Sequence, residues 1–184
     1  MEGEAFASAG LPEPAYGCVF CVTGKELIAA QQIERAYGDV RAVVARQLKI
    51  MSSKGKENAG EEITYEKILY PGYIFFEAPT DKDMFGRMQK DENIISVLST
   101  GAGDWQLYGS DAKLVQWFFS YGGLLPFSEG YKDGDRIRII KGPLKDLEKS
   151  IICVDKHRKN ALVAITFCNR EIKTWLKFEL FEKI

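Results

Sequence analysis

The chain has 184 residues, 46% of them apolar, and a formal net charge of -1. This length fits one large domain or two small ones, and the apolar share is sufficient for real hydrophobic cores. The average charge argues against a nucleic-acid-binding protein whose affinity comes from neutralising phosphates. However, about 13 basic and about 8 acidic residues lie between Tyr131 and Ile184, so this part carries roughly +5 and residues 1–130 roughly -6.

Residues 1–14 are small, acidic and interrupted by proline, which predicts a disordered tail. No apolar signal segment follows a basic start, and no run is long enough to cross a bilayer, so we expect a cytoplasmic protein with reduced thiols and no membrane contact. Cys18 and Cys21 form a C-x-x-C pair, but a spacing of three in a strand puts them on opposite faces. A zinc site would also need a second pair of ligands, and Cys153 and Cys168 are separated by 14 residues. We expect buried thiols, no metal and no cofactor.

A strand from Tyr16 to Val22 is the first predicted element. Thr23 is expected to cap the following helix, with Glu26 reaching back as in a capping box, and Gly38 ends the helix. The next predicted elements are a strand at 40–51, a polar hairpin loop at 52–60, a strand at 63–76, a short helix at 80–89, a strand at 94–98 and a helix opened by Ser110. This β-α-β-β-α-β order with a further helix predicts the ferredoxin-like α+β plan.

The C-terminal part has a different pattern. Residues 122–130 contain two adjacent glycines and a proline, which predicts a linker. Beyond it, short β-branched runs separated by turns predict a small β-barrel. Its strands are expected near 136–140, 150–155, 161–167 and 172–177.

Two motifs carry a family resemblance. Tyr70 to Phe76, YPGYIFF, is similar to the PGY strand of the NGN domain, and Asp133 to Leu147, DGDRIRIIKGPLKDL, resembles the KOW motif. Their order and their separation of about 60 residues resemble the NusG-type transcription elongation factors. The resemblance implies an NGN-like domain over 15–121, a linker over 122–130 and a KOW-like SH3 barrel over 131–184.

By this resemblance, the NGN domain presents an aromatic cavity that grips the clamp helices of RNA polymerase. Tyr16, Tyr70 and Tyr73 match the aromatic positions of that cavity. Tyrosine suits such a surface, because it offers a large apolar face with a polar tip. The alternative is that the three tyrosines are ordinary core residues.

In this family the KOW domain binds RNA or a partner protein. The positive charge here favours RNA, and the structured element that it recognises is expected to be an RNA hairpin. Basic side chains fall in predicted turns, and several are expected to project from one end of the barrel. The RNA-binding candidates are Lys141, Lys145, Lys149, Lys156, His157, Arg158, Lys159 and Arg170. The alternative is a merely solvated surface, since lysine-rich turns are common.

The chain also departs from the family, because Asp146 and Lys149 stand where KOW motifs have glycine. Its basic turns look closest to specialised paralogs of the LoaP type, which act as antiterminators and recognise an RNA hairpin. We therefore expect a monomeric antitermination factor that binds RNA polymerase and nascent RNA. The alternatives are a housekeeping elongation factor whose KOW domain binds a termination or ribosomal protein, and a translation-associated RNA-binding protein. Motifs typical of enzymes are missing, so no catalysis is expected.

Overall fold

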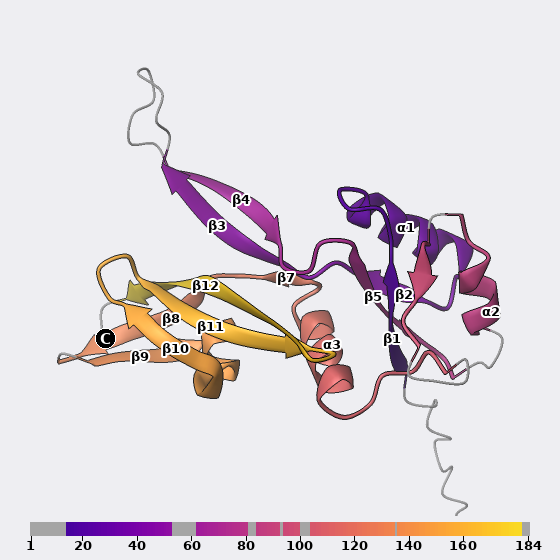
Figure 1. Cartoon of the computed structure of the whole chain (residues 1–184). Helices are drawn as coiled ribbons and strands as arrows, with labels where there is room; N and C mark the ends of the chain where they lie inside the picture. The colour runs from indigo at the N-terminus through magenta and orange to yellow at the C-terminus, as the bar shows by residue number, and fades with distance from the viewer. Residues whose placement is uncertain are drawn as a thin grey trace, which may run out of the picture.

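The computed structural model describes residues 14–52, 62–80, 84–92, 94–99, 104–134 and 136–181. Within these ranges the chain has a mixed α+β fold, as predicted, with an N-terminal module (14–127) beside a C-terminal module (128–181) (Figure 1). The predicted tail, apart from Pro14, and the predicted hairpin loop, apart from Ser52, lie outside the described residues. Among the described helices, none is long and apolar enough to cross a membrane.

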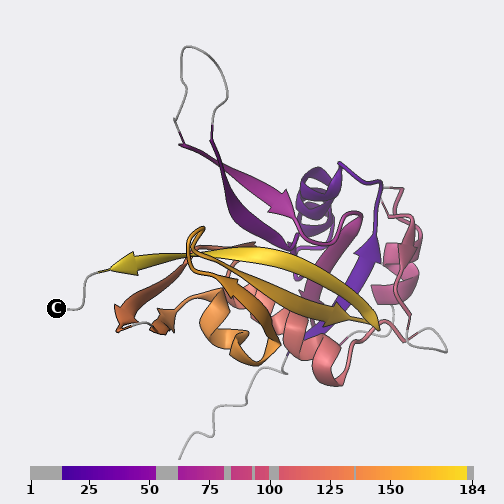
Figure 2. The same cartoon turned by 60° about the vertical axis from the view of Figure 1, so that its left-hand side comes forward.

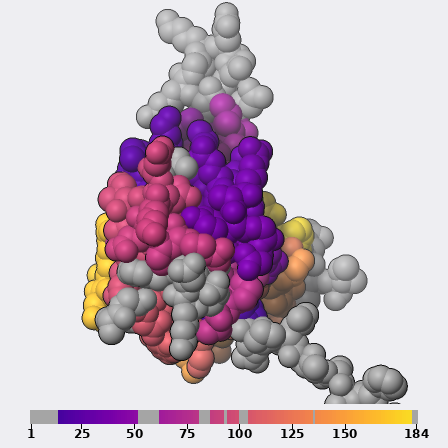
Figure 3. Space-filling view, turned by 90° about the vertical axis from the view of Figure 1, so that its right-hand side faces the viewer, coloured from indigo at the N-terminus to yellow at the C-terminus, as the bar shows by residue number. Residues whose placement is uncertain are grey.

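The N-terminal module is built on a four-stranded antiparallel sheet. Its strands are β1 (Ala15–Phe20), β2 (Arg41–Val43), β5 (Tyr73–Ala78) and β6 (Ser96–Val97), in the order β2-β5-β1-β6. The helices are α1 (Glu26–Ala36), α2 (Met84–Gln89) and α3 (Gly109–Ser120). Alternation along β5 sends Ile74 and Phe76 into one buried cluster with Ile33 of α1, and Phe75 into another with Phe118 of α3. The sheet is therefore covered on both faces. Figure 3 views the module from its outer side, where α1, α2 and their strands hide most of the C-terminal module.

Glu26 has a different role from the predicted capping box. The residue before α1 is Lys25, which makes no side-chain cap, and Thr23 does not fill that position. The buried Glu26 carboxylate instead accepts hydrogen bonds from the backbone N–H groups of Gly24 and Gly72, both at 2.8 Å. Because Gly72 has a φ of +82°, the turn before β5 needs glycine, and Glu26 ties this turn to the start of α1.

A long hairpin leaves the N-terminal module between β2 and β5. Its strands β3 (Arg46–Ser52) and β4 (Glu62–Ile68) pair in an antiparallel register, and the hairpin projects from the molecule while β3 contacts β12 (Figures 1 and 2). At the base of the hairpin, β7 (Leu124–Leu125) joins β3 in parallel, and Leu125 is buried. The segment 122–130 is therefore not a free linker, because it adds a strand to the hairpin and also contains the start of β8.

The C-terminal module is a five-stranded sheet in the order β10-β11-β12-β8-β9. The strands are β8 (Ser128–Asp133), β9 (Arg136–Lys141), β10 (Ile151–Asp155), β11 (Asn160–Phe167) and β12 (Arg170–Phe181). The strands predicted at 136–140, 161–167 and 172–177 lie within β9, β11 and β12, and the strand predicted at 150–155 matches β10 except for Ser150, which belongs to the 3-10 turn before it. Between β9 and β10, the helical turn α4 (Pro143–Asp146) and a 3-10 turn (Glu148–Ser150) replace the expected simple turn.

The two modules share one buried apolar cluster. Phe75 and Phe118 of the N-terminal module belong to it together with Phe167 and Phe178 of the C-terminal module. The rings of Phe75 and Phe167 cross at 90° with centroids 5.0 Å apart, a favourable edge-on geometry. Figure 2 shows β11 and β12 running from the far end of the C-terminal sheet to α3. The packing is thus continuous from one module to the other.

Candidate functional site

Tyr70 lies at the centre of the contact between the modules. Its side chain is 1% exposed, and its ring contacts Phe75 and Phe118 on its own side and Phe167 on the other. Its hydroxyl donates a hydrogen bond of 3.2 Å to the carbonyl of Ile165 in β11. Burial in this apolar setting raises the pKa of Tyr70. In the free chain, this tyrosine is therefore covered by the C-terminal module.

Tyr73 lies beside Tyr70, with ring centroids 5.9 Å apart, and is half-buried. The guanidinium of Arg170 lies over its ring at 5.6 Å and donates a 3.2 Å hydrogen bond to its hydroxyl. Phe167 meets the same ring edge-on at 6.2 Å. Arg170, which we predicted to bind RNA, is thus held against the predicted polymerase surface by a cation–π contact.

Tyr16 does not join this pair. It lies near the opposite end of β1, where it is half-buried and packs on Phe119 of α3 at a centroid distance of 5.9 Å. The structure therefore brings Tyr70 and Tyr73 together and leaves Tyr16 apart from them.

Polar contacts fasten the two modules around the aromatic cluster. The buried Gln47 of β3 donates a 2.7 Å hydrogen bond to Thr174 of β12. Asp146 of α4 accepts hydrogen bonds from Trp117 Nε1 at 2.8 Å and from the hydroxyl of Tyr121 at 2.6 Å. Burial, followed by this hydrogen bond and the charge of Asp146, raises the pKa of Tyr121. These contacts join β3 to β12 and α3 to α4, so the two modules are held together at two separate places.

A further contact involves Cys168, in the turn between β11 and β12. Its backbone N–H donates to Asp111 Oδ1 at 2.9 Å, and its thiol lies 3.5 Å from Asp111 Oδ2. Partial burial, the Asp111 charge and this hydrogen bond raise the pKa of Cys168 to about 11. Cys18 and Cys21 are both buried, and they point into different clusters, as their spacing predicted. Cys153 and Cys168 are exposed, so the expectation of buried thiols is wrong for these two.

The basic candidates do not gather at a single end of the C-terminal module. The connection from β9 to β10 holds Lys141, Lys145 and Lys149 at the end where Asp146 and Arg170 meet the N-terminal module. The turn between β10 and β11 lies at the opposite end. It holds Lys156, His157, Arg158 and Lys159.

The turn 156–159 is exposed at all four positions. Asp155 orders it by accepting a 2.9 Å hydrogen bond from the backbone of Arg158, and the Arg158 guanidinium lies 3.8 Å from the same carboxylate. Lys159 has a φ of +52°, a conformation that non-glycine residues rarely adopt. A tight cationic turn thus projects from the end of the molecule that is remote from the aromatic contact.

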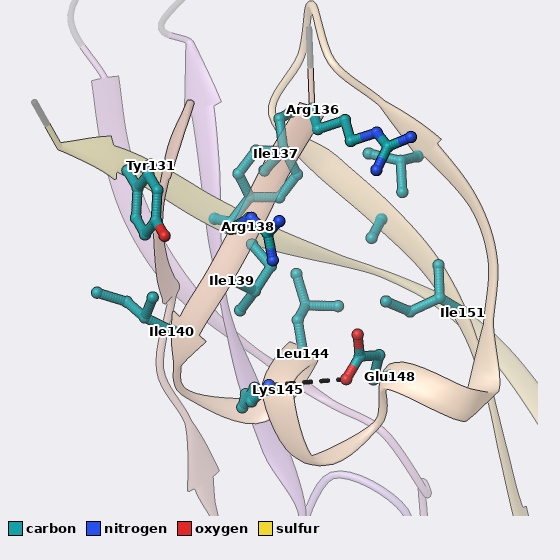
Figure 4. A pocket seen from close by; sticks show the side chains of 13 residues that line it. Tyr131, Arg136, Ile137, Arg138, Ile139, Ile140, Leu144, Lys145, Glu148 and Ile151 are labelled. Atoms are coloured by element: carbon teal, nitrogen blue, oxygen red, sulfur yellow. Dashed lines mark ion pairs between the residues drawn. The ribbon is translucent and has the colours of Figure 1, made fainter. Parts of the chain in front are cut away.

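Two of the other lysines have acidic neighbours. Lys141 pairs with Glu129 at 3.3 Å, and Lys145 pairs with Glu148 at 3.7 Å at one margin of a hollow of about 540 Å³ (Figure 4). This hollow lies between β9 and β10, which end the sheet on either side and are not paired with each other. Ile137, Ile139, Leu144, Ile151, Val154 and Phe178 provide its apolar lining.

Asp146 and Lys149 are accommodated without backbone strain. Neither is among the described residues with a positive φ, because the helical turns of this connection keep both in ordinary conformations. Gly142 has the one positive φ of this connection, at +91°, and a Cβ there would lie 2.8 Å from the Cα of Ser128. Asp146 thus fits this turn in an ordinary backbone conformation, and its carboxylate accepts hydrogen bonds from Trp117 and Tyr121.

Sequence reasoning missed the partners that the C-terminal module supplies to the aromatic cluster. Phe167 ends an alternating strand, which predicts burial but not burial against another module. Thr174 gave no signal of its own, and Asp146 stood out only as a replacement for a family glycine. Their contacts could not be predicted, because their partners lie 25 to 127 residues away in the chain.

Known proteins, among them the two that follow, are similar to this chain, although no model of a known protein family matches it. The transcription termination/antitermination protein NusG of Borreliella burgdorferi is 25% identical over 134 residues, which cover 68% of this chain and 73% of that protein. A solved structure described as "Domain interaction in Thermotoga maritima NusG" has a TM-score of 0.51 and 21% identity, covering 91% of this chain and 96% of that chain. The second likeness concerns the fold.

Proposed function

We propose that this chain, which belongs to the NusG family, is a transcription elongation and antitermination factor that binds RNA polymerase through its N-terminal module and RNA through its C-terminal module. The observation that carries the proposal is the pair Tyr70 and Tyr73 on the PGY strand, joined into one aromatic surface. A surface of this kind suits a site that is buried both in the free chain and in a complex.

We assign the N-terminal module to the ferredoxin-like NGN arrangement and the C-terminal module to the KOW barrel. The first assignment is supported by the antiparallel order β2-β5-β1-β6, with one helix after each of the first and third sheet strands. The second is supported by five short strands and by the Gly142-Pro143 turn, whose geometry requires glycine. The extra helical turns between β9 and β10 are this chain's own variation.

Binding to the clamp helices of RNA polymerase requires the KOW barrel to leave the aromatic surface. In the closed chain, Phe167 and Arg170 occupy the faces of Tyr70 and Tyr73 that a partner would use. The apparent association constant for polymerase is then the constant of the open state multiplied by the fraction of molecules that are open. Any RNA that binds the open barrel better than the closed chain would favour docking, since a ligand shifts an equilibrium only through differential affinity.

The proposed mechanism is binding without chemistry. The docked NGN module bridges the clamp and favours the processive state of polymerase, so pausing and termination decrease. The exposed cationic turn 156–159 would hold nascent RNA near the exit, because it projects from the end opposite the polymerase surface. This placement lets both ligands bind at once.

The RNA part of the proposal is tested with the full chain and a salt series. Replacing Lys156, Arg158 and Lys159 together by glutamine should weaken binding to a hairpin RNA. It should also lower the slope of log affinity against log salt concentration by about three, one for each charge removed. A triple glutamine variant at Lys25, Arg35 and Lys90 of the N-terminal module is the matched control and should behave like the parent. Failure of the parent to bind hairpin RNA at low salt would refute RNA binding by the barrel.

One observation favours a second candidate, the housekeeping factor with a protein partner. The hollow between β9 and β10 has two unpaired strand edges, an apolar lining and arginines 136 and 138 at its margin (Figure 4). An extended acidic peptide could add a strand there. Retention of a termination or ribosomal protein by a chain that binds no RNA would favour this candidate over the first.

A further inference from the structure

A small cleft lies between the projecting hairpin and the C-terminal module. It has a volume of about 220 Å³ and belongs to neither the aromatic contact nor the hollow between β9 and β10. Lys49 and Ile50 of β3 form one wall, and the middle of β12 with the turn between β10 and β11 forms the other. The residues on that second wall are Asp155, Arg158, Asn160, Trp175 and Lys177. The cleft is smaller than the pockets of about 300–1,000 Å³ that enclose drug-sized ligands, so it suits a single planar group.

Trp175 is the unusual residue of this cleft. Along β12, its neighbours Thr174 and Leu176 point into the protein and are buried, whereas Trp175 is on the outer face and 39% exposed. Of the three tryptophans, Trp105 is buried and Trp117 is hydrogen-bonded to Asp146. A large aromatic ring on the outer face of a strand, beside cationic side chains in a cleft, offers a flat surface on which a base can stack.

The cleft is also strongly cationic. Lys49, Arg158 and Lys177 line it against one carboxylate, that of Asp155, which already holds Arg158. The Lys49 ammonium donates to the carbonyl of Trp175 at 2.5 Å, and burial followed by the nearby charge of Lys67 lowers its pKa. Concentrating like charges in a half-closed space is unfavourable by itself, and a bound phosphate would relieve the repulsion.

We propose that this cleft binds one unpaired nucleotide of RNA, with the base stacked on Trp175 and its phosphates held by Lys49, Arg158 and Lys177. The inference rests on the proposed RNA binding of the barrel. It adds the site that distinguishes unpaired from paired RNA, because stacking on Trp175 requires a base that is not paired. Arg158 belongs to both the cationic turn and the cleft, so an RNA strand lying along the turn passes directly into it. The hairpin β3–β4 thus contributes to RNA binding through Lys49.

The test compares two RNAs bound to the full chain: a hairpin with an unpaired loop, and a fully paired duplex with the same stem. Trp175→Ala should weaken hairpin binding about five- to one-hundred-fold, the usual effect of one stacking aromatic, and leave duplex binding unchanged. Trp175→Phe should keep most of the affinity, because phenylalanine still stacks. Lys49→Gln should lower the slope of log affinity against log salt by about one. The hairpin should quench the tryptophan fluorescence of the parent, and it should quench that of a Trp117→Phe variant at least as much, because Trp117 lies outside the cleft.

Three results decide the proposal. If the parent binds the hairpin and Trp175→Ala binds it equally well, the cleft is not the site, although the RNA-binding function stands. If Trp175→Ala loses hairpin and duplex binding alike, its effect is on the fold or the general electrostatics, and the stacking site is again refuted. If the parent binds neither RNA, this inference falls together with the proposed RNA function.

Discussion

Tyr70 joins the two modules through both its ring and its hydroxyl. The ring contacts Phe118 on one side and Phe167 on the other, and the hydroxyl donates to the Ile165 carbonyl. The PGY motif predicted an aromatic at a functional surface, and it could not indicate what covers that surface in the free chain. The covering residues come from β11, about 95 positions later, and no local pattern encodes that distance.

Replacing Tyr70 separates its two contributions. Tyr70→Ala should lower the free energy of unfolding by about 3–5 kcal/mol, since it removes a fully buried ring. Tyr70→Phe should cost only about 1 kcal/mol, the usual effect of losing one hydrogen bond. Urea unfolding measures both, and Tyr65→Ala, at an exposed tyrosine of β4, is the control that should stay within about 0.5 kcal/mol of the parent. A Tyr70→Ala variant as stable as the parent would contradict the shared core.

Cys168 makes stability depend on pH in the alkaline range. Its pKa is raised to about 11 from an ordinary value of 9.0, so the folded chain keeps the thiol protonated where the unfolded chain loses the proton. The contribution is complete below pH 9 and is lost as pH rises toward about 11. The fall in unfolding free energy between pH 8 and pH 10 should be larger for the parent than for Cys168→Ser, which does not titrate there. Equal falls would show that the contact with Asp111 has no energetic weight.

At the scale of elements, the strands were predictable and the helical connection of the C-terminal module was not. Alternation of β-branched residues marks β11 from Asn160 to Phe167 clearly, because one face of a sheet is buried. The four residues of α4 are too few for a helical period to appear. The Gly142-Pro143 pair predicted only that the chain turns there, and the proline then became the first residue of the helical turn.

Gly142 is the residue on which this connection depends. Gly142→Ala should lower the free energy of unfolding by about 2 kcal/mol or more, because its φ is +91° and the new Cβ would lie 2.8 Å from Ser128. Gly134→Ala is the matched control, with a φ of +60° but open space around the Cβ position, and it should cost about 1 kcal/mol. Thermal unfolding compares the two variants, and equal losses would mean that the close approach to Ser128 does not matter.

At the scale of the whole molecule, the closed arrangement of the modules could not be predicted from the sequence. The charge asymmetry correctly separated an acidic N-terminal part from a basic C-terminal part, but it did not indicate that Arg170 lies on Tyr73. Contacts such as Gln47 with Thr174 span 127 positions of the chain. Because the buried cluster is continuous, we expect the parent to unfold in a single transition.

Asp146 is the residue through which opening can be adjusted without touching the aromatic surface. It accepts hydrogen bonds from Trp117 and Tyr121 near the surface, and losing both should favour the open state by about 1 kcal/mol, roughly a five-fold change. Asp146→Ala should therefore increase cleavage by protease within residues 122–130, whereas Asp146→Asn, which keeps an acceptor oxygen, should increase it less. Unchanged cleavage in Asp146→Ala would show that these bonds do not hold the modules closed.

The most direct measurement of the central claim is the equilibrium affinity of the full chain for a purified, transcribing RNA polymerase, with the parent and Asp146→Ala titrated side by side. The account predicts that both bind and that the variant binds roughly five-fold more tightly, since more of its molecules expose Tyr70 and Tyr73. Binding by neither protein would contradict the polymerase function. Weaker binding by Asp146→Ala would contradict the closed state as the form that must open.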